Sequence, residues 1–268
     1  MGEYLNLIVP CGISQLTNLD PKEMPSGYKS FLERLRNGPE EKQEEAYRSD
    51  DAKLFRLAVL EKIRRAKDDE VGSSRKWLGS ELSTLKALQQ REGNRSWRPA
   101  QDIVTLLRTD TWAGLYAAET VHLALVEHWQ VIDDENFLRI VQVSGWKPNQ
   151  TIIVAKSALG NLADAINGKL LESKKNSPDK YYNVLVATGG MRSTLPCLTI
   201  YSLLYGFEMV CLTEESDALL ELQPAKAGAE KRIDWKSILH NQKGGVGSLL
   251  QSYIIKVLNF EKGDNEYW

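Results

Sequence analysis

Cysteine and histidine are scarce in this sequence, and their scarcity excludes two common kinds of site. The 268 residues include three histidines and three cysteines, Cys11, Cys197 and Cys211. The cysteines are too few and too scattered for a disulfide scaffold, and none forms a CxxC pair that would indicate structural zinc. The sequence also lacks an HExxH motif and any carboxylate cluster with metal-ligand spacing. We therefore expect neither a metal site nor a resident cofactor.

An excess of charge of either sign is missing as well. Lys and Arg together number 34, Asp and Glu together number 36, and the formal net charge is −2. A chain without positive excess does not attract a long polyanion through its overall field, so we expect no binding of long nucleic acid. Any anion that this protein binds must be held by a local cluster of donors.

Long hydrophobic runs are absent from the sequence. The longest apolar runs have the length of strands, well short of a membrane span. The first ten residues contain neither the basic segment nor the long apolar segment of a secretory signal. We therefore expect a reduced, cytoplasmic protein without membrane association.

Short apolar runs alternate with segments of helical periodicity, which predicts an α/β fold. We expect strands over 4–10, 103–107, 137–143, 182–187, 207–212 and 218–222, and helices over 28–36, 114–128, 150–172 and 195–206. This alternation is typical of a Rossmann-like, doubly wound and mostly parallel sheet. We assign residues 1–224 to this domain and residues 225–268 to a short helical C-terminal extension.

Residues 40–91 interrupt this alternation with a charged, helical segment. Its first apolar series contains Leu54, Leu57, Ala58, Val59 and Ile63, and a second series, from Trp77 to Leu88, follows Gly72-Ser73-Ser74. We interpret the segment as a helical hairpin inserted between the first two strands. Its mixed charges favour a solvated helix face, with a lid or a dimer contact as the alternative.

Two polar loops directly follow predicted strands, where α/β sheets bind their ligands. They are Gly12 to Asn18 and Thr188 to Arg192. Glycines let backbone N–H groups approach a phosphate, and Arg192 adds a charge with bidentate reach. By themselves, Gly189 and Gly190 are equally consistent with a tight strand-to-helix turn. Neither loop has GxxxxGK[ST] or GxGxxG spacing, so an ATPase loop or an ordinary NAD site is not predicted.

Four segments together resemble a known family, that of the CRISPR-associated Rossmann-fold (CARF) domains. Residues 10–18, PCGISQLTN, resemble the CGTSLLTN loop after that family's first strand. Residues 188–192, TGGMR, are similar to its TGG-x-K segment. The stretch from Thr109 to Glu119 looks like its SDT-x-x-G-x-x-A-A-E stretch, and residues 158–162, ALGNL, look like its GL-x-NL helix. The matches occur in family order and span residues 5 to about 222.

The resemblance implies a homodimer that binds a cyclic oligoadenylate across its two-fold axis. It implies that Ser14 positions ribose or phosphate and that Arg192 stabilises the phosphorane formed when a ribose 2′-hydroxyl attacks its adjacent phosphate. Asp110 has a second interpretation, as the cap of a helix that begins near Thr111. The ligand-binding residues implied are Gly12, Ile13, Gln15, Thr17, Asn18, Thr109, Asp110, Thr188, Gly189, Gly190, Met191 and Ser193.

Among the functions open to such a domain, we favour a metal-independent ring nuclease. It would cleave cyclic oligoadenylate, with cyclic tetra-adenylate favoured, and so switch off type III CRISPR signalling. The preference rests on residues 225–268, which are too few for the effector domain that many CARF proteins carry. The alternative is a non-catalytic sensor that acts through a partner protein or DNA. A Rossmann-like regulator of another small anion, without a CRISPR role, also stays open.

Overall fold

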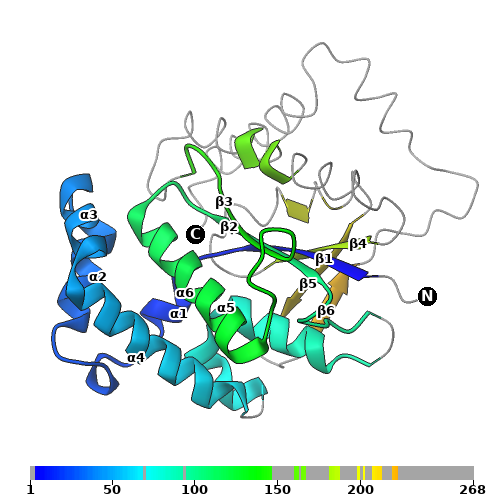
Figure 1. Ribbon diagram of the computed structural model, residues 1–268, viewed down its shortest axis with the longest axis horizontal. Coiled ribbons are helices and arrows are strands. Elements are labelled where there is room, and N and C mark those ends of the chain that lie inside the picture. Colours follow the sequence, from blue (N-terminus) through cyan, green and yellow to red (C-terminus); the bar gives the residue numbers. More distant parts are fainter. Residues whose placement is uncertain are drawn as a thin grey trace, which may run out of the picture.

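The protein is built around a six-stranded, mostly parallel sheet (Figure 1). The computed structural model describes residues 4–68, 71–92, 95–146, 160–162, 164–166, 181–187, 198–199, 202, 207–212 and 219–222, with only the backbone of residues 14, 15 and 71–77. The strands are β1 (Tyr4–Pro10), β2 (Ile103–Arg108), β3 (Leu138–Gln142), β4 (Tyr181–Val186), β5 (Glu208–Leu212) and β6 (Leu219–Leu222). The order is β3-β2-β1-β4-β5-β6, with β5 and β6 alone antiparallel among these pairs. The predicted Rossmann-like α/β fold is confirmed.

Strand β1 lies at the centre of the sheet, between β2 and β4. Asn6 of β1 pairs with Ile103 on one side and with Asn183 on the other, both in parallel. The chain builds outward from β1 through β2 and β3, and then starts again at β4 on the opposite side. The order of the strands therefore reverses between β1 and β4. Such a reversal leaves a crevice outside the carboxyl ends of the strands, where α/β proteins bind ligands.

Five α-helices of the described residues lie between β1 and β2 in the sequence, and a sixth lies between β2 and β3. They are α1 (Ser14–Thr17), α2 (Tyr28–Asn37), α3 (Glu40–Arg48), α4 (Asp50–Lys67), α5 (Val71–Gln90) and α6 (Trp112–Trp129), with a short 3-10 helix at Pro21–Glu23. The helices lie on one side of the sheet, where α5 and α6 contact the strands and α2, α3 and α4 pack against other helices (Figure 1). Within the described part of the chain, no helix has both the length and the apolar character needed to cross a membrane.

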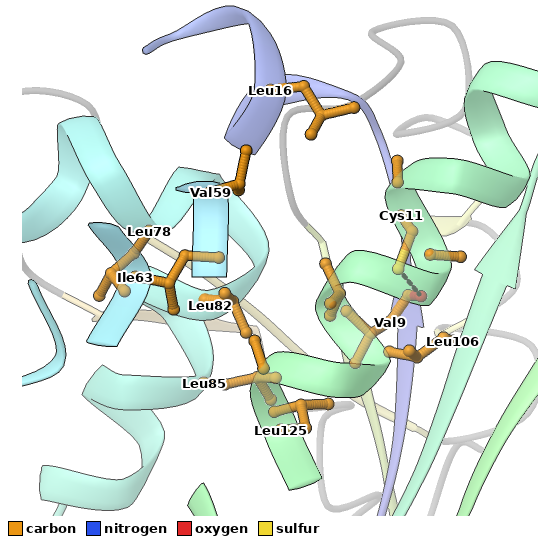
Figure 2. Packing of buried hydrophobic residues seen from close by; sticks show 14 of the residues in the cluster. Val9, Cys11, Leu16, Val59, Ile63, Leu78, Leu82, Leu85, Leu106 and Leu125 are labelled. Atoms are coloured by element: carbon orange, nitrogen blue, oxygen red, sulfur yellow. Dashed lines mark hydrogen bonds between the residues drawn. The ribbon is translucent and has the colours of Figure 1, made fainter. Parts of the chain in front are cut away.

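Side chains that alternate along the strands pack into two separate hydrophobic cores, one on each face of the sheet. Leu7 and Val9 of β1 pack into the core on the side of these helices, whereas Ile8 between them points to the other face. Figure 2 shows Val9 beside Leu106 of β2, with Leu125 of α6 and Leu85 of α5 facing them. On the other face, the buried residues include Leu162 and Ile166, as predicted for the inner side of the helix over 150–172.

The predicted helical hairpin over 40–91 is wrong in its number of helices. The segment contains α3, α4 and α5, because Ser49 ends α3 and caps α4 by accepting a hydrogen bond from the Ala52 N–H at 3.2 Å. The expected break at Gly72-Ser73-Ser74 lies inside α5. The helix instead breaks at Gly79, whose φ of 68° and ψ of 176° are favourable only for glycine.

The apolar face predicted for α4 is also partly wrong. Leu54 and Leu57 are 52% and 65% exposed, whereas the buried stripe contains Ala52, Phe55, Val59, Leu60, Ile63 and Ala66. Phe55 decides the orientation, because its ring packs against the rings of Tyr28 and Phe31 at centroid distances of 5.4 and 5.1 Å. An aromatic ring buries more apolar area than a leucine, so its contacts outweigh those of Leu54 and Leu57.

Candidate functional site

The loop after β1 (residues 11–18, the β1 loop) is closely tied to its surroundings. The Cys11 N–H donates to the Leu107 carbonyl at 2.7 Å, which extends the pairing of β1 with β2 by one residue. The N–H groups of Leu16 and Thr17 both donate to the Ile13 carbonyl at 3.0 Å. Leu16 is 1% exposed, and its carbonyl accepts from the Tyr28 hydroxyl at 2.9 Å. The β1 loop therefore has a fixed backbone at the carboxyl edge of the sheet.

Several predicted ligand-binding residues of this loop lie at the protein surface. Thr17 and Asn18 are exposed, and Gly12 and Ile13 are half-buried. The Thr17 hydroxyl donates to the Ile13 carbonyl at 3.2 Å, so it is partly used within the loop. Ser14 and Gln15 lie in the short helix α1, where the structure describes their backbone. The loop thus offers a ligand polar groups from a rigid backbone, and the roles of these residues stay predictions.

A buried carboxylate lies behind the β1 loop, and the sequence analysis missed it. The Gly12 N–H donates to Glu81 Oε1 at 2.7 Å, and the Ser80 hydroxyl donates to Oε2 at 3.1 Å. Glu81 has no exposed surface, so the Gly12 N–H points into the protein and is already in use. Burial, and then the charge of Glu81, raise the pKa of the Cys11 thiol well above its ordinary value.

The sequence did contain a signal for Glu81. It is three residues after Leu78 and four before Leu85, so it lies on the apolar stripe of α5, where an acidic residue is unexpected. A buried charge of this kind is costly unless hydrogen bonds satisfy it. An acid on an apolar stripe therefore predicts a buried partner, although the sequence does not say which one.

The loop after β2 (residues 109–111, the β2 loop) joins β2 to α6 by a compact hydroxyl pair. Thr109 is buried, and its hydroxyl lies 2.9 Å from that of Thr111. The Thr111 hydroxyl accepts from the Gly114 N–H at 3.0 Å and so caps α6. A Cβ atom on Gly114 would lie 2.0 Å from the Thr109 hydroxyl oxygen, so this close approach requires glycine.

Asp110 does not cap α6, and this interpretation of the sequence is wrong. Its carboxylate instead accepts from the Gly145 N–H at 3.1 Å and from the Gln142 amide, and its own N–H donates to the Trp146 carbonyl at 2.8 Å. All three partners belong to the end of β3 or the residues that follow it. Asp110 therefore holds the β2 loop and the segment after β3 together at the carboxyl edge.

Arg108, the last residue of β2, is a half-buried cation at this edge that the sequence analysis did not select. Its guanidinium donates to the Thr109 carbonyl at 3.1 Å and to the Gln142 side-chain oxygen. Burial lowers its pKa, and Asp110, Glu119 and Tyr47 act in the opposite direction, but an arginine stays protonated. Its hydrogen-bond acceptors are uncharged oxygens, although Asp110 and Glu119 lie near enough to act on its charge.

Helices α3 and α4 brace the start of α6 through a second polar cluster. The Glu119 carboxylate accepts from the Tyr47 hydroxyl and from the Arg56 guanidinium, both at 2.7 Å. The Tyr47 ring also packs against Trp112 at a centroid distance of 5.0 Å, and Arg48 lies over that indole at 5.7 Å. Since these groups already contact one another, we assign the cluster to support of the site.

The carboxylates near the site are engaged by the protein itself. Glu81, Asp110 and Glu119 accept the hydrogen bonds given above, from backbone, hydroxyl, amide or guanidinium groups. In the ranges that the structure describes, no group of three or more His, Cys, Asp or Glu side chains is arranged to hold a metal ion.

The second predicted loop lies outside the described residues. It contains Thr188, Gly189, Gly190, Met191, Arg192 and Ser193. Strand β4, which ends just before this loop, runs parallel to β1, and the Ala187 N–H donates to the Val210 carbonyl at 2.7 Å. Ala187, the last described residue before this loop, therefore lies at the same edge of the sheet as the β1 and β2 loops. The contacts of Arg192 stay a prediction.

Comparison with known proteins gives one family. The model of a family described as CRISPR-associated protein (Cas_APE2256) matches residues 76–225, which is more than half of the chain. The matched segment contains Glu81, the β2 loop and residues 188–193, whereas the β1 loop precedes it. A comparison with curated proteins gave no match.

Proposed function

We propose that this chain, which belongs to the CRISPR-associated protein (Cas_APE2256) family, binds a cyclic oligoadenylate at the carboxyl edge of its sheet and cleaves the ring. Family membership supports a role in a CRISPR system. The observation that carries the proposal is the reversal of strand order at β1, which gathers the β1 loop, Arg108 and the β2 loop at one edge. Small anionic ligands of α/β proteins bind in such a crevice.

The proposed ligand is a ring of adenosine phosphates, with cyclic tetra-adenylate favoured. A two-fold symmetric ring suits a homodimer, in which each protomer presents the same groups to half of the phosphates. Arg108 would contribute positive charge, the exposed Asn18 would donate hydrogen bonds, and the exposed Thr17 would offer its hydroxyl oxygen as an acceptor. Arg192 would add a second cation from each protomer. A near-neutral protein with a few aimed donors fits a small anion better than a long nucleic acid.

The proposed cleavage is an internal transfer that uses neither water nor metal. A ribose 2′-oxygen attacks the adjacent phosphorus, the bond from phosphorus to the 5′-oxygen breaks, and the hydroxyl proton ends on the 5′-oxygen. The products are linear, with a 2′,3′-cyclic phosphate at one end and a 5′-hydroxyl at the other. Such a reaction requires in-line placement of the hydroxyl, assigned here to Ser14, and stabilisation of phosphorane charge, assigned to Arg192. An arginine cannot act as the base at neutral pH.

The test is incubation with labelled cyclic tetra-adenylate and cyclic hexa-adenylate in the presence of EDTA. We expect linear product with a cyclic phosphate end, formed faster from the tetra-adenylate. Arg192→Ala should lower the cleavage rate by about 100-fold to 1,000-fold, the usual effect of removing a group that stabilises transition-state charge. Arg192→Lys, which keeps the charge, should retain more of the rate.

Each outcome decides a different part of the proposal. Tight binding without linear product over hours would contradict the nuclease and favour a sensor that acts through a partner. Failure to bind either ring would reject the ligand class altogether. If Arg192→Ala cleaved at the wild-type rate, the activity would stand and the assignment of Arg192 would be wrong.

A further inference from the structure

We infer that Glu81 is a positioning residue, which holds the β1 loop in its ligand-binding shape through the Gly12 N–H. The part of this inference that concerns ligand affinity rests on the proposed function. The part that concerns the loop rests on the structure alone. Through Glu81, the helical segment 40–91 takes a role in the site. From the sequence, this segment is interpreted as a solvated helix face, with a lid or a dimer contact as the alternative.

The contact between Glu81 and the loop is short, joins a buried carboxylate to a half-buried backbone N–H, and is made across a long sequence separation. The Gly12 N–H lies 2.7 Å from the Glu81 carboxylate, 69 residues away in the chain. Glu81 has no exposed surface, so water does not compete for its oxygens. A hydrogen bond to an ionised acceptor is about twice as strong as one between neutral groups. Glu81 is therefore a strong anchor for the first residue after the β1–β2 ladder.

The break in α5 places Glu81 where a helix favours a carboxylate. Gly79 interrupts the helix, so Ser80 and Glu81 lie in the first turn of its second half. The N-terminal turn of a helix carries a partial positive charge that stabilises a negative side chain. The same half of the helix is anchored by Leu82, Leu85 and Leu88, which have no exposed surface. The carboxylate is thus carried by a rigid element of the core.

The β1 loop has two anchors on this face of the sheet. Glu81 of α5 accepts from its beginning at Gly12, and Tyr28 of α2 donates to the Leu16 carbonyl in its short helix. Figure 2 shows Leu16 above Val59 and Cys11 beside Val9, so the loop also packs on the core between these anchors. Loss of the first anchor would leave the Gly12 N–H without its acceptor and free the beginning of the loop, where the chain leaves β1.

The experiment compares Glu81→Gln with Glu81→Ala in a chain that carries Cys197→Ser and Cys211→Ser, which leaves Cys11 as the single thiol. Glutamine keeps an oxygen acceptor for the Gly12 N–H, whereas alanine removes it. Both variants remove the charge that raises the pKa of Cys11, so this effect on the thiol is common to them. Any difference between them in the rate of Cys11 alkylation therefore reports the opening of the loop.

We expect alkylation of Cys11 to be about tenfold faster in Glu81→Ala than in Glu81→Gln, because an unsatisfied buried donor shifts a local opening equilibrium by about that factor. The dissociation constant for cyclic tetra-adenylate should rise about tenfold or more in Glu81→Ala and stay near the wild-type value in Glu81→Gln. If Glu81→Ala does not fold, Glu81→Met, which has similar volume and no oxygen acceptor, replaces it.

The control is Glu208→Gln, a change at another fully buried glutamate, at the opposite edge of the sheet. It should leave ligand affinity unchanged and speed Cys11 alkylation no more than its loss of global stability, measured by urea denaturation, accounts for. Equal alkylation rates in the alanine and glutamine variants of Glu81, in a folded protein, would overturn the inference. If the wild type binds no cyclic oligoadenylate, the proposed function fails, and the alkylation rates still decide the role of Glu81.

Discussion

Two fully buried glutamates lie near opposite ends of the parallel strands, and they have different hydrogen-bond partners. At the amino end of β5, Glu208 accepts from Arg91 at 2.9 Å and from Arg95 at 3.0 Å, and Arg91 also bridges to Glu221 at 2.7 Å. At the carboxyl edge, the described hydrogen bonds to Glu81 come from a backbone N–H and a hydroxyl. At the amino edge, ion pairs join the side chains of distant segments, and at the carboxyl edge a carboxylate accepts a hydrogen bond from the backbone of a loop.

We therefore expect the two edges to affect different properties of the protein, stability at one edge and ligand binding at the other. Removing one partner of a buried ion pair leaves a charge without compensation, so the amino edge should control the free energy of unfolding. A hydrogen bond to the backbone of a loop fixes local shape, so the carboxyl edge should control ligand affinity. The comparison predicts that substitutions at the two edges have effects of different kinds.

The largest expected effect is on stability, at the amino edge. Glu208→Ala leaves Arg95, which is 28% exposed, without its carboxylate, and leaves Arg91, which is 15% exposed, with Glu221 as its remaining partner. Because breaking a buried ion pair is strongly destabilising, the free energy of unfolding should fall by about 3–5 kcal/mol. Urea denaturation measures this loss. A loss of less than about 1 kcal/mol, or weaker ligand binding by the folded variant, would contradict the division between the edges.

A smaller effect is expected on affinity, at the carboxyl edge. Arg108→Gln removes a half-buried charge whose acceptors are neutral, so cyclic tetra-adenylate should bind about tenfold more weakly, as for loss of one charged hydrogen bond. Titration calorimetry measures this change. The control is Arg65→Gln, which alters an exposed arginine paired with Glu61 at 2.9 Å and should not affect affinity. Equal losses in both variants would show that Arg108 acts only through overall charge.

The smallest expected effect is a change in the pH dependence of stability. Burial and the neighbouring Glu81 raise the pKa of Cys11 above its ordinary value of 9.0, so the folded thiol stays protonated where the unfolded thiol ionises. Stability is therefore intact below pH 9 and is lost as the pH rises further. By about pH 10 the wild type should lose about 1 kcal/mol more than Cys11→Ala, measured by urea denaturation. Parallel pH curves would show that Cys11 is accessible to water.

Much of the sheet could be predicted from the sequence, because strands buried on both faces form continuous apolar runs. The buried face of α4 could not, since leucines occur on both sides of that helix. The choice depends on Phe55, whose partners Tyr28 and Phe31 come from another helix. The sequence pattern shows that α4 has an apolar periodicity, but the buried side of the helix is the one whose side chains contact large aromatic residues of α2.

The sequence analysis selected the loops of the candidate site, whose function stays a prediction, and it missed the contacts within them. Loops after strands can be recognised locally, but Glu81 reaches Gly12 only through the packing of α5 on the sheet. By residue type, Asp110 is the better cap of the two, because Asp ranks above Thr at this position. The pairing of β3 with β2 brings Gln142 and Gly145 to Asp110, and this leaves Thr111 to cap α6. Such assignments depend on contacts between distant segments.

The central position of β1 has a consequence for synthesis of the chain. Its Asn6 pairs with Asn183, which is 177 residues later, and a ribosome adds roughly 5–20 residues per second. The first strand made must therefore wait about ten seconds or more for its second neighbour, with one edge unpaired. Helices α2 to α5 are made in between, and they belong to the same hydrophobic core as Leu5, Leu7 and Val9. They can shield the nascent strand from aggregation until β4 leaves the ribosome.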